Sequence, residues 1–448
     1  MSVKERINFG SKLGVVAAAA GSAVGLGNIW RFPYELGQYG GGAFLCIYLI
    51  CVVVLGMPIM LSEFVIGRMG QANAAGAFKK LAKNPRWRFV GVMGVAASFM
   101  IMGFYVVVSG WTLEYVFQAL GNQFSHRDTA TLSQVFTDFS SSTFRPIIWM
   151  LLFLILTASI VLAGVQKGIE SSSKFLMPLL LVLIIALGVR SVTLPGGMEG
   201  LKFLFQPDFS KINSAVILSA MGQAFFSLSL GMGCMITYGS YISKKNHLSH
   251  TVLEVTILDT TIAILASVAI FPAVFSLGIN PAQGPELVFI TLPNVFAHMP
   301  GGFIWAVLFF VLLSVAALTS TISLLEVIVA YFVEEFQIGR VKTVLLASLG
   351  IFILGVISSL SLGIWKDYQI FGMGFFGLLD NLTSKILMPV GGLFIAIFVG
   401  WKLDKAKILN ELNGNGRFKT SYFKLYLFLI RYVAPVGITL IIINLLSE

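Results

Sequence analysis

The sequence predicts an all-α membrane protein that forms one transmembrane domain over residues 1–448, and three observations lead to this prediction. Hydrophobic residues make up 57% of the chain and charged residues only 11%, and the mean hydropathy is +0.90. Because an ordinary globular domain is roughly 25% charged, this chain cannot cover itself with a water-facing surface. The apolar residues also stand in continuous runs and do not alternate with polar ones, which indicates spanning helices and not a β-barrel.

The apolar runs set the order of the elements. A membrane-spanning helix needs about 20 apolar residues. Eleven runs meet this length, and we expect one helix from each of 13–36, 41–66, 89–120, 147–165, 170–189, 214–241, 255–278, 302–333, 343–364, 369–400 and 425–446. An odd number of spans places the two ends of the chain on opposite sides of the membrane.

The basic residues predict which side is which. The net charge of +10 comes from 30 Lys and Arg against 20 Asp and Glu. If the N-terminus is cytoplasmic, 21 of the 30 basic residues fall in cytoplasmic segments, six in outer segments and three within spans. This bias follows the positive-inside rule. We therefore expect a multi-pass protein of the cell membrane with a cytoplasmic N-terminus, and the charge gives no reason to expect a nucleic-acid partner.

Several enzyme classes find no support in the sequence. The three cysteines fall in apolar runs, and the four histidines stand at no metal-ligand spacing. The chain has no Walker motif and no nucleophile elbow, so we expect no enzyme. Residues 372–377 match GxGxxG, but they follow no soluble strand, and close helix packing within the membrane is the better interpretation.

Two runs are predicted to be broken helices. Residues 21–28 of the first run hold three glycines, and residues 227–233 of the sixth run combine two serines with two glycines. Each Gly costs about 1 kcal/mol relative to Ala inside a helix, and small polar side chains compete for backbone hydrogen bonds. We expect both stretches to unwind. The alternative is that these glycines only let helices pack closely.

Unwound backbone inside a membrane points to a binding site. It is tolerated only where it is buried in protein or lines a cavity. Free carbonyls can bind a cation, and the start of the following half-helix can bind an anion. The first and sixth runs also correspond to each other in a five-plus-five inverted repeat. The pair of breaks therefore predicts a site for a zwitterion and sodium near the middle of the membrane.

The motifs around these breaks resemble those of the neurotransmitter:sodium symporter family. The resemblance rests on Gly21–Pro33 (GSAVGLGNIWRFP), Gly40–Phe44 (GGGAF), Pro58, Glu63–Arg68 and Leu228–Gly233, and it extends over essentially the whole chain. Eleven spans with short ends are similar to the bacterial amino-acid branch. The resemblance implies the LeuT-type fold, with one repeat over 11–190, an inverted repeat over 212–400 and an additional span over 424–446.

The resemblance implies two sodium sites. The first uses carbonyls of Gly21, Val24 and Ala316 and hydroxyls of Thr319 and Ser320. These oxygens suit sodium, a hard cation, although Thr and Ser in a helix more commonly bond back to their own backbone. The second site uses the Ala23 carbonyl, Asn28, Ser227 and the substrate carboxylate, with Asp259 at a position that is often Asn in relatives. We expect Asp259 to offset the sodium charge so that chloride is not required; the alternative is a protonated structural acid.

The resemblance also assigns the substrate site and two gates. The substrate carboxylate meets the amides of Leu26 and Gly27 and the Tyr105 hydroxyl, and the ammonium meets carbonyls of Ala23, Phe226 and Ser227, with Ser229 nearby. The side-chain pocket comprises Ile101, Phe226, Met232, Ser320 and Leu324. The outer gate pairs Arg31 with Asp380. The inner gate joins Arg6 to Glu334 or Glu335, assisted by Tyr241, with Phe9 where relatives usually have Trp; Glu326, Lys385 and Arg431 receive no role.

These assignments predict a secondary active symporter that imports a hydrophobic or aromatic L-amino acid with one or two sodium ions by alternating access. A charged substrate side chain would be buried without a partner in the apolar pocket. Three alternatives stay open: a symporter for small aliphatic amino acids, a non-transporting receptor or channel of the same fold, and proton coupling through Asp259. The expected partners are the amino acid and the lipid bilayer, and the sequence leaves the oligomeric state open.

Overall fold

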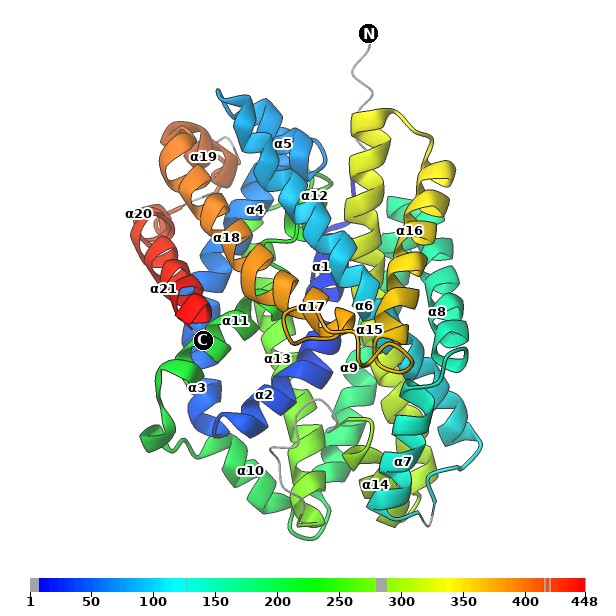
Figure 1. Cartoon of the computed structure of the whole chain (residues 1–448). Helices are drawn as coiled ribbons and strands as arrows, with labels where there is room; N and C mark the ends of the chain where they lie inside the picture. Colours follow the sequence, from blue (N-terminus) through cyan, green and yellow to red (C-terminus); the bar gives the residue numbers. More distant parts are fainter. Residues whose placement is uncertain (1–7, 126, 279–287, 415, 419, 448) are drawn as a thin grey trace.

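The computed structural model describes residues 8–125, 127–278, 288–414, 416–418 and 420–447. Over these residues the protein is built of helices and turns, and no strand is present apart from an isolated bridge between Ile370 and Met373. The predicted all-α class is confirmed. Figure 1 shows the helices as one bundle, in which α5 and α19 lie at one end and α7, α10 and α14 at the other.

Nine continuous helical stretches of the described chain are long and apolar enough to cross a membrane. Four are single helices: α8 (Arg145–Leu162), α13 (Leu248–Ser276), α15 (Gly302–Phe336) and α16 (Arg340–Leu360). The others join several segments: α3 (Gly42–Cys51), η2 (Val52–Gly56) and α4 (Met57–Gly70); η3 (Pro85–Trp87) and α6 (Arg88–Leu120); η4 (Val165–Glu170) and α9 (Ser171–Val192); α17 (Phe375–Asn381), η7 (Leu382–Leu387), α18 (Met388–Ile397) and η8 (Phe398–Lys402); α20 (Phe423–Phe428), η9 (Leu429–Val433) and α21 (Ala434–Ser447).

The two remaining predicted spans are broken, as expected. The first consists of α1 (Lys12–Ala23), followed after a break by η1 (Gly27–Arg31) and α2 (Phe32–Gln38), with a 50° bend between the halves. The sixth consists of α11 (Ser214–Ser227) and α12 (Cys234–Gly239), of which only α11 is an apolar helix of ten or more residues. The broken centres are therefore present, whereas the total of eleven spans stays a prediction.

Backbone geometry explains both breaks. In the first, Val24 is extended, and a Cβ added to Gly25 would lie 2.2 Å from the Ser320 hydroxyl oxygen. Only glycine lets the backbone approach the neighbouring span so closely. In the sixth, Ser229, Gly231 and Gly233 have φ values of 53°, 77° and 79°. Three left-handed residues within five positions end the helix at this point.

The structure also differs from the sequence prediction in the connections between spans. Short helices occupy several of them: α5 (Ala74–Leu81), α7 (Thr129–Ser140), α10 (Gly197–Phe205), α14 (Thr291–His298) and α19 (Lys405–Leu412). The predicted helix packing at residues 372–377 is wrong. Gly372 has a φ of 74° and lies in the turn before α17, and a Cβ added to Gly372 or Gly377 would meet no atom within 4 Å.

The broken segments lie within the bundle. α1 packs against α9, α13 and α15, and α12 packs against α4 and α15. The longest helices, α6 and α15, run along each other beside them (Figure 1). The backbone groups freed by the two breaks are therefore enclosed by protein, as membrane-embedded irregular backbone must be.

Candidate functional site

A buried polar cluster joins η1 of the first span, α11 of the sixth span and α13, the seventh span. The Asn28 amide donates to the Asp259 carboxylate at 2.8 Å and to the Ser227 hydroxyl at 3.1 Å, and that hydroxyl donates to the second Asp259 oxygen at 2.7 Å. All three residues are fully buried. Tyr48 also donates to Ser227 at 3.1 Å, a contact that the sequence analysis missed. Three members of the predicted second sodium site thus meet, and Ala23, the fourth, is the last residue of α1.

Residues of the predicted first sodium site come close to one another between α1, in the first span, and α15, the eighth span. The Thr319 and Ser320 hydroxyls lie 3.2 and 3.3 Å from the Val24 carbonyl oxygen. The Thr319 hydroxyl also donates to the Ala316 carbonyl at 2.9 Å, and a Cβ added to Gly21 would lie 3.4 Å from the Thr319 Cβ. Gly21 and Val24 therefore lie against Thr319 and Ser320 of α15, where Thr319 bonds back to Ala316 of its own helix. The oxygens of this set are the kind that a hard cation prefers.

The predicted carboxylate-binding groups also come together. The Leu26 amide donates to the Tyr105 hydroxyl at 2.8 Å, and Gly27 packs so closely on the Phe226 ring that an added Cβ would lie 2.8 Å from it. Leu26, Tyr105 and Phe226 line a cavity of about 190 Å³. Aromatic side chains form most of its remaining wall: Trp30, Tyr34, Phe104, Trp111, Phe136 and Phe376, with Arg31 and Asp380 beside them.

The other predicted pocket residues do not line this cavity. Ile101, Met232, Ser320 and Leu324 are each at most 7% exposed, and none belongs to its wall. The Ser229 hydroxyl donates to the Ser22 carbonyl at 2.9 Å. It therefore joins the break of the sixth span directly to the end of α1.

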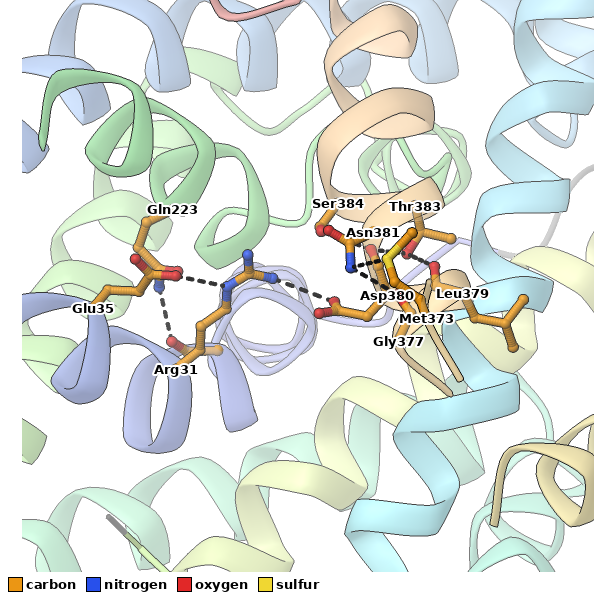
Figure 2. A network of polar contacts seen from close by, with 11 residues as sticks. Arg31, Glu35, Gln223, Met373, Gly377, Leu379, Asp380, Asn381, Thr383 and Ser384 are labelled. Atoms are coloured by element: carbon orange, nitrogen blue, oxygen red, sulfur yellow. Dashed lines mark hydrogen bonds and ion pairs between the residues drawn. The ribbon is translucent and has the colours of Figure 1, made fainter. Parts of the chain in front are cut away.

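The predicted pairing of Arg31 with Asp380 is present, as Figure 2 shows, and both residues line the cavity. The Arg31 Nη1 atom lies 3.6 Å from Asp380, its Nε atom lies 3.7 Å from Glu35, and the guanidinium covers the Phe226 ring at 4.6 Å. Gln223 donates to the Gly27 carbonyl at 2.9 Å within the same network. The sequence analysis did not assign a role to Glu35 or Gln223.

At the end of the bundle where α5 and α19 lie, the predicted inner-gate residues fall into two groups. Glu334 accepts the Asn73 amide at 2.7 Å, and Glu335 pairs with Arg88 at 2.9 Å. Arg6 lies outside the described residues.

The second group forms around Glu326. This fully buried residue accepts the Tyr241 hydroxyl at 2.8 Å and pairs with Arg340 at 2.6 Å, although neither Glu326 nor Arg340 had been given a role. The start of α16 therefore comes into contact with the ends of the sixth and eighth spans.

Glu63 is a further buried acid beside the break of the sixth span. It is fully buried, and its carboxylate accepts the Gly231 amide at 2.7 Å. The sequence analysis used this residue only as part of a motif. A buried carboxylate that accepts a backbone amide satisfies one of the groups freed by the break.

Comparison with known proteins gives consistent matches over the whole chain. The model of the sodium:neurotransmitter symporter family matches residues 6–134 and 123–448. An uncharacterized sodium-dependent transporter of Bacillus subtilis is 39% identical over 447 residues, covering 100% of this chain and 99% of the relative. A counterpart in Haemophilus influenzae is 40% identical, covering 98% of each chain. The crystal structure of MhsT in complex with L-phenylalanine superimposes with a TM-score of 0.92 at 45% identity, covering 98% of this chain and 99% of that one.

Proposed function

Because the chain belongs to the sodium:neurotransmitter symporter family, and is thus a sodium-dependent multi-pass transporter and not an enzyme, we propose that it imports a hydrophobic or aromatic L-amino acid with one or two sodium ions. The observation that carries this proposal is that the two helix breaks lie together inside the bundle, where Ser229 in the break of the sixth span bonds to Ser22 at the end of α1. The breaks free backbone amides and carbonyls for ligands of both charges.

The sodium ions occupy the two sites suggested by the polar contacts. One ion lies between Gly21, Val24, Ala316, Thr319 and Ser320, and holds the end of α1 against α15. The other lies beside Ala23, Asn28, Ser227 and Asp259, where the Asp259 carboxylate offsets its charge. Because Asp259 supplies this negative charge, chloride is not needed.

The substrate binds next to these ions. Its carboxylate takes the amides of Leu26 and Gly27 and the Tyr105 hydroxyl, and its ammonium takes carbonyls at Ala23, Phe226 and Ser227. The cavity that Leu26, Tyr105 and Phe226 line has mostly aromatic walls, which favours a hydrophobic or aromatic side chain. The bound L-phenylalanine in MhsT is consistent with this preference. Ile101, Met232, Ser320 and Leu324 do not line this cavity, so in this proposal they enclose the side chain only after it moves further into the bundle.

Transport follows by alternating access, with the N-terminus in the cytoplasm. Arg31 and Asp380 close the outer side, and Glu334, Tyr241 and Arg6 belong to the inner side. Each sodium ion that enters releases about 2.3 kcal/mol at 100 mV. A tenfold sodium gradient adds about 1.4 kcal/mol per ion. Two ions supply about 7 kcal/mol, which is enough for strong accumulation of the amino acid.

A panel of radiolabelled amino acids in proteoliposomes tests the proposed function. Sodium gradients are imposed in one arm and replaced by potassium in the other. We expect uptake of Phe, Tyr, Trp, Leu and Ile that depends on sodium, and little uptake of Asp or Lys. Saturable binding without accumulation would instead indicate a receptor, and a preference for Ala and Gly would indicate a small aliphatic substrate.

For the pair formed by Arg31 and Asp380 we predict an effect of moderate size. The change Asp380→Asn removes one of the two carboxylates near Arg31 and leaves Glu35 as its remaining partner. Since the Asp380 side chain is 36% exposed, its attraction to Arg31 is partly screened. We expect the maximal rate of sodium-driven uptake to fall about three- to tenfold while equilibrium substrate binding changes less. Kinetics of uptake, compared with binding in detergent, measure the two effects; an unchanged maximal rate would contradict the assignment.

A further inference from the structure

The start of α1 is attached to the fifth span through one buried acid. The Glu170 carboxylate accepts the Gly10 amide at 2.7 Å and the Ser11 hydroxyl at 3.0 Å. Glu170 is the last residue of η4, the π-helical segment that precedes α9, and its side chain is 4% exposed. A second contact from η4 supports the attachment, since Gln166 donates to the Asn8 carbonyl at 2.6 Å.

The local sequence of α1 is suited to this acid. A Cβ added to Gly14 would lie 2.0 Å from the Glu170 Oε1 atom, so the carboxylate lies directly on the surface of α1 at a position where only glycine fits. Ser11 also accepts the Gly14 amide as the N-cap of α1. The same residues therefore begin the helix and contact Glu170.

Glu170 has a partner that does not depend on α1. Lys174 lies four residues further on in the same span and pairs with the carboxylate at 2.6 Å. If α1 moved away, Glu170 would lose Gly10 and Ser11 but keep Lys174. A buried carboxylate with no partner is costly, so this intrahelical pair makes separation from α1 reversible.

We propose that Glu170 is the positioning residue that anchors the start of α1 to η4 and α9, the fifth span. We also propose that this contact must break before the bundle can open at the end where α5 and α19 lie. The proposal rests on the proposed function, because it assumes that α1 swings during transport. In that scheme α1 is held at two ends. Thr319 and Ser320 hold Val24 at one end, where the proposed first sodium ion binds, and Glu170 holds Gly10 and Ser11 at the other end, away from both proposed sodium sites.

The experiment measures how often α1 separates from α9. Met177 is 7% exposed, and its sulfur would lie 3.5 Å from a Cβ added to Gly21, so it is covered by α1. The change Met177→Cys introduces a reporter thiol at this covered position. The purified full-length protein is treated with a water-soluble thiol reagent in the presence of sodium, and peptide mass spectrometry measures the rate of alkylation at residue 177. Glu170→Gln is then added to the reporter background.

We expect Glu170→Gln to raise the alkylation rate about tenfold, since it removes the charge from two charge-assisted hydrogen bonds. Gly14→Ala displaces the same carboxylate from the side of α1 and is expected to act in the same direction, so the test survives if Glu170→Gln does not fold. The matched control is Glu254→Gln. It breaks the pair between Lys12 and Glu254, whose side chains are 55% and 38% exposed, and is expected to change the rate less than about twofold.

Two outcomes would overturn the anchor: rates within twofold of the reporter protein in both Glu170→Gln and Gly14→Ala, or an equal rise in Glu254→Gln. Uptake by the wild-type protein decides the proposed function separately. A wild-type protein that fails to transport would refute the symport proposal, whereas the alkylation rates would still report whether Glu170 holds α1 in place.

Discussion

Replacing Thr319 and Ser320 together by alanine is expected to reduce sodium-driven uptake to the level of protein-free liposomes. Their hydroxyls lie 3.2 and 3.3 Å from the Val24 carbonyl and supply two of the five oxygens of the proposed first sodium site. Sodium needs several oxygen ligands to replace its hydration shell, and no other side chain of the predicted set can take their place. The double variant also removes the hydroxyl contacts that join the end of α1 to α15. Uptake in proteoliposomes with an imposed sodium gradient measures the effect.

The same helix offers a matched control. Thr321 follows directly in α15, but its hydroxyl turns toward the fourth span, where it lies 3.0 Å from the Thr157 hydroxyl. Thr321→Ala removes a buried hydroxyl of the same kind without touching α1, so uptake is expected to stay within about threefold of wild type. Thermal unfolding of each variant in detergent separates lost binding from lost fold. Persistent sodium-driven uptake in the folded double variant would show that the ion does not bind there.

Asp259→Asn is expected to lower uptake about a hundredfold or more at fixed sodium concentration. The carboxylate is fully buried and its described hydrogen-bond donors, Asn28 and Ser227, are neutral, so a bound sodium ion is the natural counter-charge. Removing one member of a buried charge pair costs about 3–5 kcal/mol. Since each 1.4 kcal/mol is a factor of ten, the expected loss is large. The sodium concentration for half-maximal uptake should rise accordingly.

Anion replacement tests the same residue in the unmodified protein. If Asp259 supplies the charge that offsets sodium, wild-type uptake should be the same in chloride and in gluconate, and a collapse in gluconate would refute the assignment. Thr256→Ala is the matched control for Asp259→Asn, because Thr256 is buried on the same helix, less than one turn before Asp259, and is not part of the proposed site. A pH-sensitive dye inside the liposomes tests whether Asp259 also carries a proton, which is the alternative coupling.

Much of the fold followed from short-range sequence patterns. Apolar runs of about 20 residues predict helices wherever they occur, and the clustered glycines between 21 and 27 and between 231 and 233 predict the unwound centres that the structure contains. The short helices α5, α7, α10, α14 and α19 were not predicted. They contain few residues, and length and hydropathy do not distinguish them from loops.

The candidate site, like the fold, was predicted only in part. The residue types near Asn28, Thr319 and Asp259 pointed to cation ligands, because polar groups inside a span are expensive unless they have a task. Which of them meet followed only from the family resemblance, because residue types in single spans do not show how the spans pack. The contacts of Glu326 with Arg340 and Tyr241, and of Glu63 with the Gly231 amide, join residues whose partners are set by how separate helices pack.

The amino-acid sequence alone was enough to establish an all-α membrane protein with two interrupted helices and a family resemblance that the comparisons confirm. These features depend on the composition of single segments and on local backbone preferences, which a sequence carries directly. The tertiary structure alone paired Glu326 with Arg340, set Glu63 against the Gly231 amide, and set Glu170 against the start of α1. These contacts join different helices or turns, so they depend on the rotation and depth of each helix in the bundle, which no single segment encodes.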